Sequence, residues 1–179
     1  MTVPPFVCGA LGLYAFALSS DHFKERGYHI VVGILIAVIG LIPAVTVSSS
    51  VGQYISLCVL LSGVYISAPL TMAWLSGNTP EPGKRALVLG VNGFGNLGGV
   101  VGAQLYRQRY RPDYRIPFYV TLGFLAVALV GYLLYRFMLQ AVNKRKAALL
   151  SMMTEEEVES ERLNDRRYAD KKLTFVYGL

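Results

Sequence analysis

The fold is decided by residues 28–75, which read YHIVVGILIAVIGLIPAVTVSSSVGQYISLCVLLSGVYISAPLTMAWL. This stretch contains no Asp, Glu, Lys or Arg. A membrane-spanning helix needs about 20 predominantly apolar residues, so the stretch is long enough for two of them. Its only turn-like sequence is VSSSVGQ, at residues 47–53. We therefore expect two spans here, joined by a short turn.

Three other windows also lack charged side chains: residues 3–20, 86–106 and 116–135. Each is long enough to cross a bilayer as a helix. We therefore expect an all-α membrane protein with about five transmembrane helices. Pro69 lies inside the third helix and should kink it, because proline removes a backbone hydrogen bond. The expected spans are residues 3–20, 30–47, 54–75, 86–106 and 117–135.

The composition agrees with a membrane protein. Hydrophobic residues make up 54% of the chain and charged residues 16%, whereas a soluble domain carries about 25% charged residues. The net charge is +6, but the basic residues lie in the expected loops and tail, and no nucleic-acid motif is present. We expect contact with the lipid bilayer and no nucleic-acid partner. Cys8 and Cys58 lie in apolar segments and are expected to be packing residues.

The chain divides into a five-helix bundle at residues 1–139 and a polar tail at residues 140–179. The tail cannot bury much apolar surface, so we expect it to be mobile. The side of the membrane that holds the tail also holds eight Lys and Arg residues, against four on the other side. The positive-inside rule therefore places the tail in the cytoplasm. The eight are Lys24, Arg26, Lys84, Arg85, Arg136, Lys144, Arg145 and Lys146, and the four are Arg107, Arg109, Arg111 and Arg115.

Polar side chains gather in the third and fourth spans. Asn92 and Asn96 are four residues apart and share one face of a helix. Polar groups within a membrane face a bundle interior or a wet cavity, because their exposure to lipid is unfavourable. The pair could contact a substrate in a central cavity, or it could form hydrogen bonds between helices. Tyr14 and Tyr65 are further cavity candidates. Trp74 could also contribute to substrate selection, but its place near a helix end favours an interfacial anchor.

The fourth span is also rich in glycine. Gly95 and Gly99, and likewise Gly98 and Gly102, form G-x-x-x-G pairs that permit close approach of another helix. A G-x-G-x-x-G string occurs at residues 93–98. It lies in a charge-free span without a βαβ unit or a later acidic partner, so we do not expect a dinucleotide site.

The loop at residues 21–27 reads DHFKERG. Asp21 at a helix end, a following base such as Arg26, and a turn at Gly27 could lock two helices through charge and dipole contacts. The alternative is a solvated charged loop. His22 and His29 have no ligand set at suitable spacing, so we expect no metal. Because the spans hold no ionisable cluster, nucleophile–base set or phosphate loop, we expect neither an enzyme nor a cofactor.

Short stretches along the chain also follow a known pattern in order and spacing. They are TVPPF (2–6), SDHFKERG (20–27), AWLSGN (73–78), GKRA (83–86), GNLGG (95–99), YR (106–107), PDY (112–114) and LTFVYGL (173–179). With them, the sequence resembles the C-terminal half of major facilitator superfamily transporters. Among these it is similar to the fungal allantoate permease-like anion:cation symporters, which include nicotinate and pantothenate transporters.

The resemblance implies that the five spans are helices eight to twelve of a twelve-helix transporter. Such a transporter would carry a small organic anion with a proton across the plasma membrane. Helices eight, ten and eleven would face the substrate cavity and helices nine and twelve the lipid, a division that the distribution of polar residues also favours. Residues 21–27 would be the family's cytoplasmic signature loop, with Asp21 and Arg26 at its acidic and basic positions and His22 in place of an arginine.

A transporter of this kind has an N-terminal half and a helix seven, for which this sequence has no counterpart. Alternating access rocks two halves about a site at their interface, so these five helices would offer one wall of the cavity. We expect that the chain does not transport alone and that its partner is the missing N-terminal half of the parent transporter. The alternative is a small membrane protein that associates with itself or with other subunits through the glycine-rich fourth span.

Overall fold

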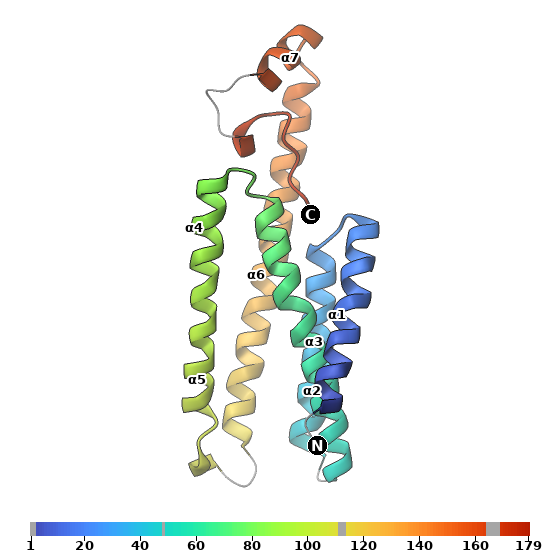
Figure 1. The fold of residues 1–179 in the computed structure, drawn as a ribbon, viewed down its shortest axis with the longest axis vertical. Helices are drawn as coiled ribbons and strands as arrows, with labels where there is room; N and C mark the ends of the chain where they lie inside the picture. Colours follow the sequence, from blue (N-terminus) through green and yellow to red (C-terminus); the bar gives the residue numbers. More distant parts are fainter. Residues whose placement is uncertain (1–2, 48, 111–113, 164–168) are drawn as a thin grey trace.

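The computed structural model describes residues 3–47, 49–110, 114–163 and 169–179. Its long helices run side by side (Figure 1), and no strand occurs among these residues. Five helical segments are long and apolar enough to cross a membrane. The all-α membrane fold with five spans is therefore confirmed. The elements are α1 (Val3–Phe23), α2 (Gly27–Thr46), α3 (Ser50–Gly77), α4 (Pro82–Gly93), η1 (Phe94–Leu97), α5 (Gly98–Leu105), η2 (Gln108–Tyr110), α6 (Arg115–Leu150), α7 (Glu155–Leu163) and η3 (Ala169–Lys171).

The first three spans lie where the sequence predicts. Helix α2 ends at Thr46 and α3 begins at Ser50, so their junction falls within the expected polar stretch. Helix α3 continues through Pro69 as one helix. Arg111 of the arginine-rich loop, Pro112 and residues 164–168 lie outside the described residues.

The fourth span is interrupted rather than continuous. Helix α4 begins with Pro82 in its first turn, a position that suits proline. After Gly93 the chain forms the 3₁₀ turn η1 and then resumes as α5. Glycine is a poor helix former, and the break falls where Gly93, Gly95 and Gly98 follow one another closely.

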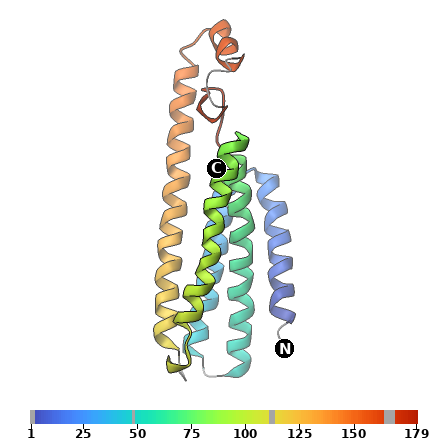
Figure 2. The same cartoon turned by 60° about the vertical axis from the view of Figure 1, so that its left-hand side comes forward.

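The fifth span continues beyond the expected end of the bundle. Helix α6 runs through residue 139 to Leu150 and projects past the other spans (Figure 2). The sequence RFMLQAVNKRKAALL at residues 136–150 consists mostly of good helix formers, which sustain the helix outside the apolar segment. The end of the bundle at which α6 projects is called the tail end below.

The core lies between α2 and α3. A Cβ atom placed on Gly63 would collide with the backbone of Ala37, and one on Gly40 with the backbone of Leu60. These glycines let the two helices approach closely, as small residues do in membrane bundles. The buried hydrophobic cluster extends from this contact towards the tail end and comprises Ile30, Ile34, Ile66, Leu70, Trp74 and Leu139.

Exposed apolar side chains follow the outer face of α2. Val32, Leu35, Ile39 and Ile42 are all exposed, although the opposite face of the same helix is the most buried part of the bundle. The span formed by α4, η1 and α5 contributes no buried residue. It therefore packs loosely in this chain.

Candidate functional site

A groove opens between α3, the α4–η1 segment and α6. Its volume is about 480 Å³. None of the side chains that line it is charged, and its polar groups are amides and hydroxyls. The lining residues are Ala68, Pro69, Thr71 and Met72 of α3, Asn92, Gly93, Gly95 and Asn96 of α4 and η1, and Tyr132 of α6.

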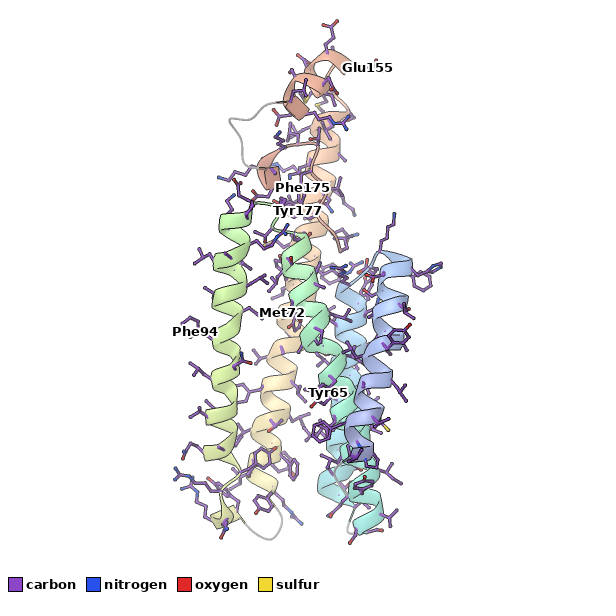
Figure 3. The ribbon with its side chains drawn as sticks, in the orientation of Figure 1. Tyr65, Met72, Phe94, Glu155, Phe175 and Tyr177 are labelled. Atoms are coloured by element: carbon purple, nitrogen blue, oxygen red, sulfur yellow. The ribbon has the colours of Figure 1, made fainter. Side chains whose placement is uncertain are left out.

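The two asparagines lie in this groove together. The Asn92 side-chain nitrogen donates to the Met72 sulfur, at 2.8 Å, and Asn96 lies one turn further along the same wall. Figure 3 shows Met72 between α3 and α4, while Phe94 points away from the bundle. The groove and the exposed Phe94 therefore mark opposite faces of the fourth span.

A hydroxyl pair closes the groove on the side of α6. The Thr71 hydroxyl donates to the Ser67 carbonyl oxygen at 2.7 Å and lies 2.8 Å from the Tyr132 hydroxyl. Because Thr71 has a single proton, Tyr132 is the donor in their contact. Sequence reasoning assigned the fifth span to lipid and missed Tyr132. The available signal was a phenol in the middle of an apolar span, where its hydroxyl needs a partner.

The two tyrosine candidates lie elsewhere. Tyr65 turns towards α1, where its ring packs against Gly9 and meets the Phe6 ring edge-on with a centroid distance of 6.0 Å (Figure 3). Tyr14 is on α1 and is 67% exposed. The structure thus brings Asn92 and Asn96 to one groove and places neither Tyr14 nor Tyr65 among the residues lining it.

The signature loop, residues 21–27, connects α1 and α2 at the tail end. An Arg26 guanidinium nitrogen donates to the Asp21 carboxylate at 3.2 Å. The tight turn is made by Lys24, whose φ is 52°, and not by the glycine. Gly27 is needed for space, because a Cβ atom there would lie 2.9 Å from Arg136 Cδ and 3.3 Å from the Trp74 ring. The expectation that Gly27 supplies the turn is therefore wrong.

A buried ion pair that the sequence did not reveal fixes this loop to α6. Arg136 donates from Nε to Glu25 Oε1 at 2.9 Å and from a terminal nitrogen to Oε2 at 3.2 Å. Its guanidinium also lies 3.6 Å from the centre of the Tyr28 ring. Arg136 is 6% exposed. A lone arginine at the end of an apolar run was the available signal, since a buried charge needs a partner.

The glycines of the fourth span face open space. A Cβ atom on Gly95, Gly98, Gly99 or Gly102 would have no neighbour within 4 Å apart from the helix's own nearby backbone. Within the described residues of one copy, no other helix packs on this face. Among those residues, no three His, Cys, Asp or Glu side chains gather closely enough to hold a metal ion.

Comparison with known proteins gives relatives among fungal transporters. The chain is 30% identical to the high-affinity nicotinic acid transporter of Saccharomyces cerevisiae over 99% of the chain and 33% of that protein. It is 36% identical to the major facilitator-type transporter hxnP of Emericella nidulans over 63% of the chain and 24% of that protein. An uncharacterized transporter of Schizosaccharomyces pombe is 29% identical over 100% of the chain and 36% of its own length.

No family model matches the chain, and no solved structure matches it. The chain spans about a third of the length of the curated relatives that it matches. Together with five helices able to span a membrane, these similarities support a relationship to the fungal transporters of the major facilitator type.

Proposed function

We propose that the chain is part of a proton-coupled transporter of small organic anions of the nicotinate class. The observation that carries this proposal is the similarity to a nicotinic acid transporter over 99% of the chain. The parent protein would belong to the allantoate permease-like symporters and lie in the plasma membrane.

The chemistry of the groove suits a carboxylate that carries an aromatic or apolar ring. The amide nitrogens of Asn92 and Asn96 can donate to a carboxylate, while Met72 and Pro69 offer apolar surface to a ring. Because no lining residue is charged, a bare anion would enter without a counter-charge, which is costly at membrane depth. A proton that travels with the anion removes this cost, so the chemistry of the groove favours proton coupling. Tyr14 and Tyr65 would contribute from a separate face of the bundle.

The groove is one wall of a complete site. Alternating access requires two halves that rock about the bound solute, so we infer that this chain alone does not transport. The missing N-terminal half would supply the second wall. The open face with Gly95, Gly98, Gly99 and Gly102 would pack against a helix of the parent protein. Small residues let helix backbones approach closely in membranes.

Uptake of radiolabelled nicotinate by the intact parent tests the proposal, in cells without their own nicotinate uptake. Asn92→Ala and Asn96→Ala should each raise the KM for nicotinate by about threefold to tenfold, because a hydrogen bond to the carboxyl group of the solute is lost. Phe94→Ala, on the opposite face, is the matched control and should leave the KM unchanged at equal surface expression. The 179-residue chain by itself should give no uptake above background.

Two results would contradict this assignment. Uptake that is unaffected by both asparagine variants would remove the groove from the substrate path. Absence of uptake for nicotinate and for related carboxylates by a well-expressed parent would remove the substrate class. Saturable uptake by purified chain in liposomes would instead show that these five helices suffice.

Self-association is the alternative that the open glycine face favours. If the chain acts as a small membrane protein, a second copy would pack on Gly98 and Gly102 in place of the parent's helices. Cross-linking of the chain in nanodiscs should then give a dimer band that Gly98→Leu removes. A monomer in both cases would exclude this alternative.

A further inference from the structure

The last residues of the chain fold back onto the tail end of the bundle. Figure 1 shows this segment returning along α6 to end beside the tips of α3 and α1. Tyr177 and Leu179 pack against the buried hydrophobic cluster. The expectation of a mobile tail therefore does not hold for residues 169–179, because the bundle supplies a site for them.

Two asparagines hold the backbone of this segment. Asn78 donates from Nδ2 to the Gly178 carbonyl at 3.0 Å and accepts from the Gly178 amide at 2.7 Å. Asn143 donates to the Tyr177 carbonyl at 2.8 Å and accepts from the Tyr177 amide at 2.9 Å. Each side-chain amide thus satisfies both backbone groups of one residue. This pairing fixes the position of the segment along the bundle without using its side chains.

Two further donors reach the end of the segment from the bundle. The Trp74 indole nitrogen donates to the Gly178 carbonyl at 2.7 Å, and the backbone amide of Arg26 in the signature loop donates to a backbone oxygen of Leu179. Trp74 is 2% exposed and Asn78 is 6% exposed. Trp74 is therefore a buried donor and not the interfacial anchor expected from the sequence. Without the segment these groups would lose their partners, which is unfavourable for buried polar atoms.

Two lysine side chains of the bundle bind the first part of this segment. The Lys146 ammonium donates to the carbonyl oxygens of Asp170, Lys172 and Phe175 at 2.9, 3.0 and 3.1 Å, so all three of its protons are used. Lys84 of α4 forms an ion pair with the Asp170 carboxylate at 2.8 Å. The Tyr177 hydroxyl donates to the Asp170 carbonyl at 2.8 Å. Burial first, and the Asp170 carboxylate second, raise the pKa of Tyr177, while Lys84 lowers it.

We propose that residues 169–179, called the clasp below, bind in a specific site across the tail end of the bundle. By binding there, the clasp holds the signature loop against α3 and α6. The site is built by the α1–α2 loop, α3, α4 and α6, which are far apart in the sequence. Most of the recognition is of backbone groups, so it depends on the asparagines and Trp74 and little on the exposed side chains of the clasp. This role is separate from the solute that the parent protein carries.

The clasp makes a local prediction about the signature loop. The Arg26 amide is a donor to the clasp, so its hydrogen exchange should be slow while the clasp is bound and fast when it is lost. Hydrogen–deuterium exchange of the full chain in lipid nanodiscs measures this directly. Truncation after Lys172 should accelerate exchange in the peptide containing residues 20–27 about tenfold or more. Exchange around Gly63, in the α2–α3 contact, should not change and serves as the internal control.

Point variants test which groups form the site. Asn78→Ala and Asn143→Ala should each accelerate exchange at residues 20–27, and each should have little further effect in the truncated chain, because their partner is already absent. Trp74→Phe keeps an aromatic ring and removes the indole donor, but the smaller ring also leaves a cavity at this buried position. Its effect on exchange at residues 20–27 is therefore compared in the full and the truncated chain, and the part due to the lost donor should be absent from the truncated chain. Val176→Ala is the matched control, since the Val176 side chain is 71% exposed.

The same variants can overturn the proposal. Unchanged exchange at residues 20–27 after truncation would show that the segment does not hold the loop. Equal effects of Asn78→Ala in the full and the truncated chain would show that Asn78 acts without the clasp. An effect of Val176→Ala as large as that of Asn143→Ala would show that side chains, and not the backbone, are recognised.

Discussion

The charged residues at the tail end differ in how much they contribute to the free energy of unfolding. Arg136 and Glu25 form a pair that is largely buried on the arginine side, with side chains 7% and 22% exposed, whereas Arg26 and Asp21 form a pair with side chains 32% and 68% exposed. Removing one partner of a buried pair leaves an uncompensated charge, but an exposed pair is screened by water. The visible signature residues Asp21 and Arg26 therefore contribute less to stability than the less obvious Glu25 and Arg136.

Arg136→Met should strongly destabilise the chain. We expect a loss of about 2–4 kcal/mol in the free energy of unfolding, because Glu25, whose side chain is 22% exposed, would stay largely desolvated without a counter-charge. Thermal unfolding in detergent measures the loss. The double variant Glu25→Gln with Arg136→Met should recover part of it, since no buried charge is left. A double variant as unstable as the sum of the two single variants would show that the ion pair is not what holds the loop.

Asp21→Asn should have a small effect on stability. The exposed ion pair with Arg26 is expected to contribute at most about 1 kcal/mol, and this contribution should fall at high salt. Thermal unfolding at low and high ionic strength measures both effects. A loss as large as that of Arg136→Met would mean that Asp21 has a further buried partner in the folded protein.

At the scale of elements, two sets of glycines serve two different surfaces. Gly40 and Gly63 lie at the α2–α3 contact, where a side chain has no room. Gly98 and Gly102 lie on a face with no neighbour within 4 Å. The sequence pattern is strongest in the second set, which shows that a G-x-x-x-G spacing identifies a face suited to packing without naming the helix that packs there.

Gly63→Ala and Gly98→Ala form a matched pair that separates the two surfaces. Gly63→Ala should destabilise the chain by about 1–3 kcal/mol, because the added methyl group meets the backbone of α2. Gly98→Ala should be neutral or stabilising in the chain alone, by up to about 1 kcal/mol, since alanine is the better helix former. Thermal unfolding of the two variants measures the difference. A stability loss for Gly98→Ala as large as that for Gly63→Ala would reveal a partner helix already present, for instance in a dimer.

The breaks and extensions of the helices were only partly visible in the sequence. The apolar window at residues 86–106 predicted one helix, but clustered glycines convert its middle into the 3₁₀ turn η1. The polar stretch after residue 139 was assigned to a tail, yet α6 continues to Leu150. Hydropathy locates the part of a helix that is apolar enough to lie in lipid. The ends of the helix are set instead by the helix propensity of the residues and by capping.

At the scale of the whole molecule, the basic residues should set the orientation in the membrane. The tail end carries the larger number of Lys and Arg residues, so residue 151 should face the cytoplasm and residue 108 the outside. Ser151→Cys and Gln108→Cys, in a chain with Cys8 and Cys58 replaced by serine, can be labelled with a membrane-impermeant maleimide. Intact cells should label position 108 at once and position 151 only after permeabilisation. The reverse pattern would invert the topology.

The sequence by itself determined the five spans, their order and the uncharged character of the fourth. These are local properties, because the thickness of the hydrocarbon core fixes how many consecutive apolar residues a span needs. The sequence predicted only part of the lining of the candidate groove. Helical spacing placed Asn92 and Asn96 on one face, but Thr71 and Tyr132 join them only through the packing of α3 against α6.

Only the tertiary structure decided which residues meet at the tail end. Glu25 and Arg136 are 111 positions apart in the chain, and Asn78 and Gly178 are 100 positions apart. No hydropathy window or helical period connects residues at such distances. Their partners are fixed by the close approach of α2 and α3 and by the extension of α6 past the other spans. Buried polar groups that need partners then select the clasp and the ion pair from the groups which this packing brings within hydrogen-bond distance.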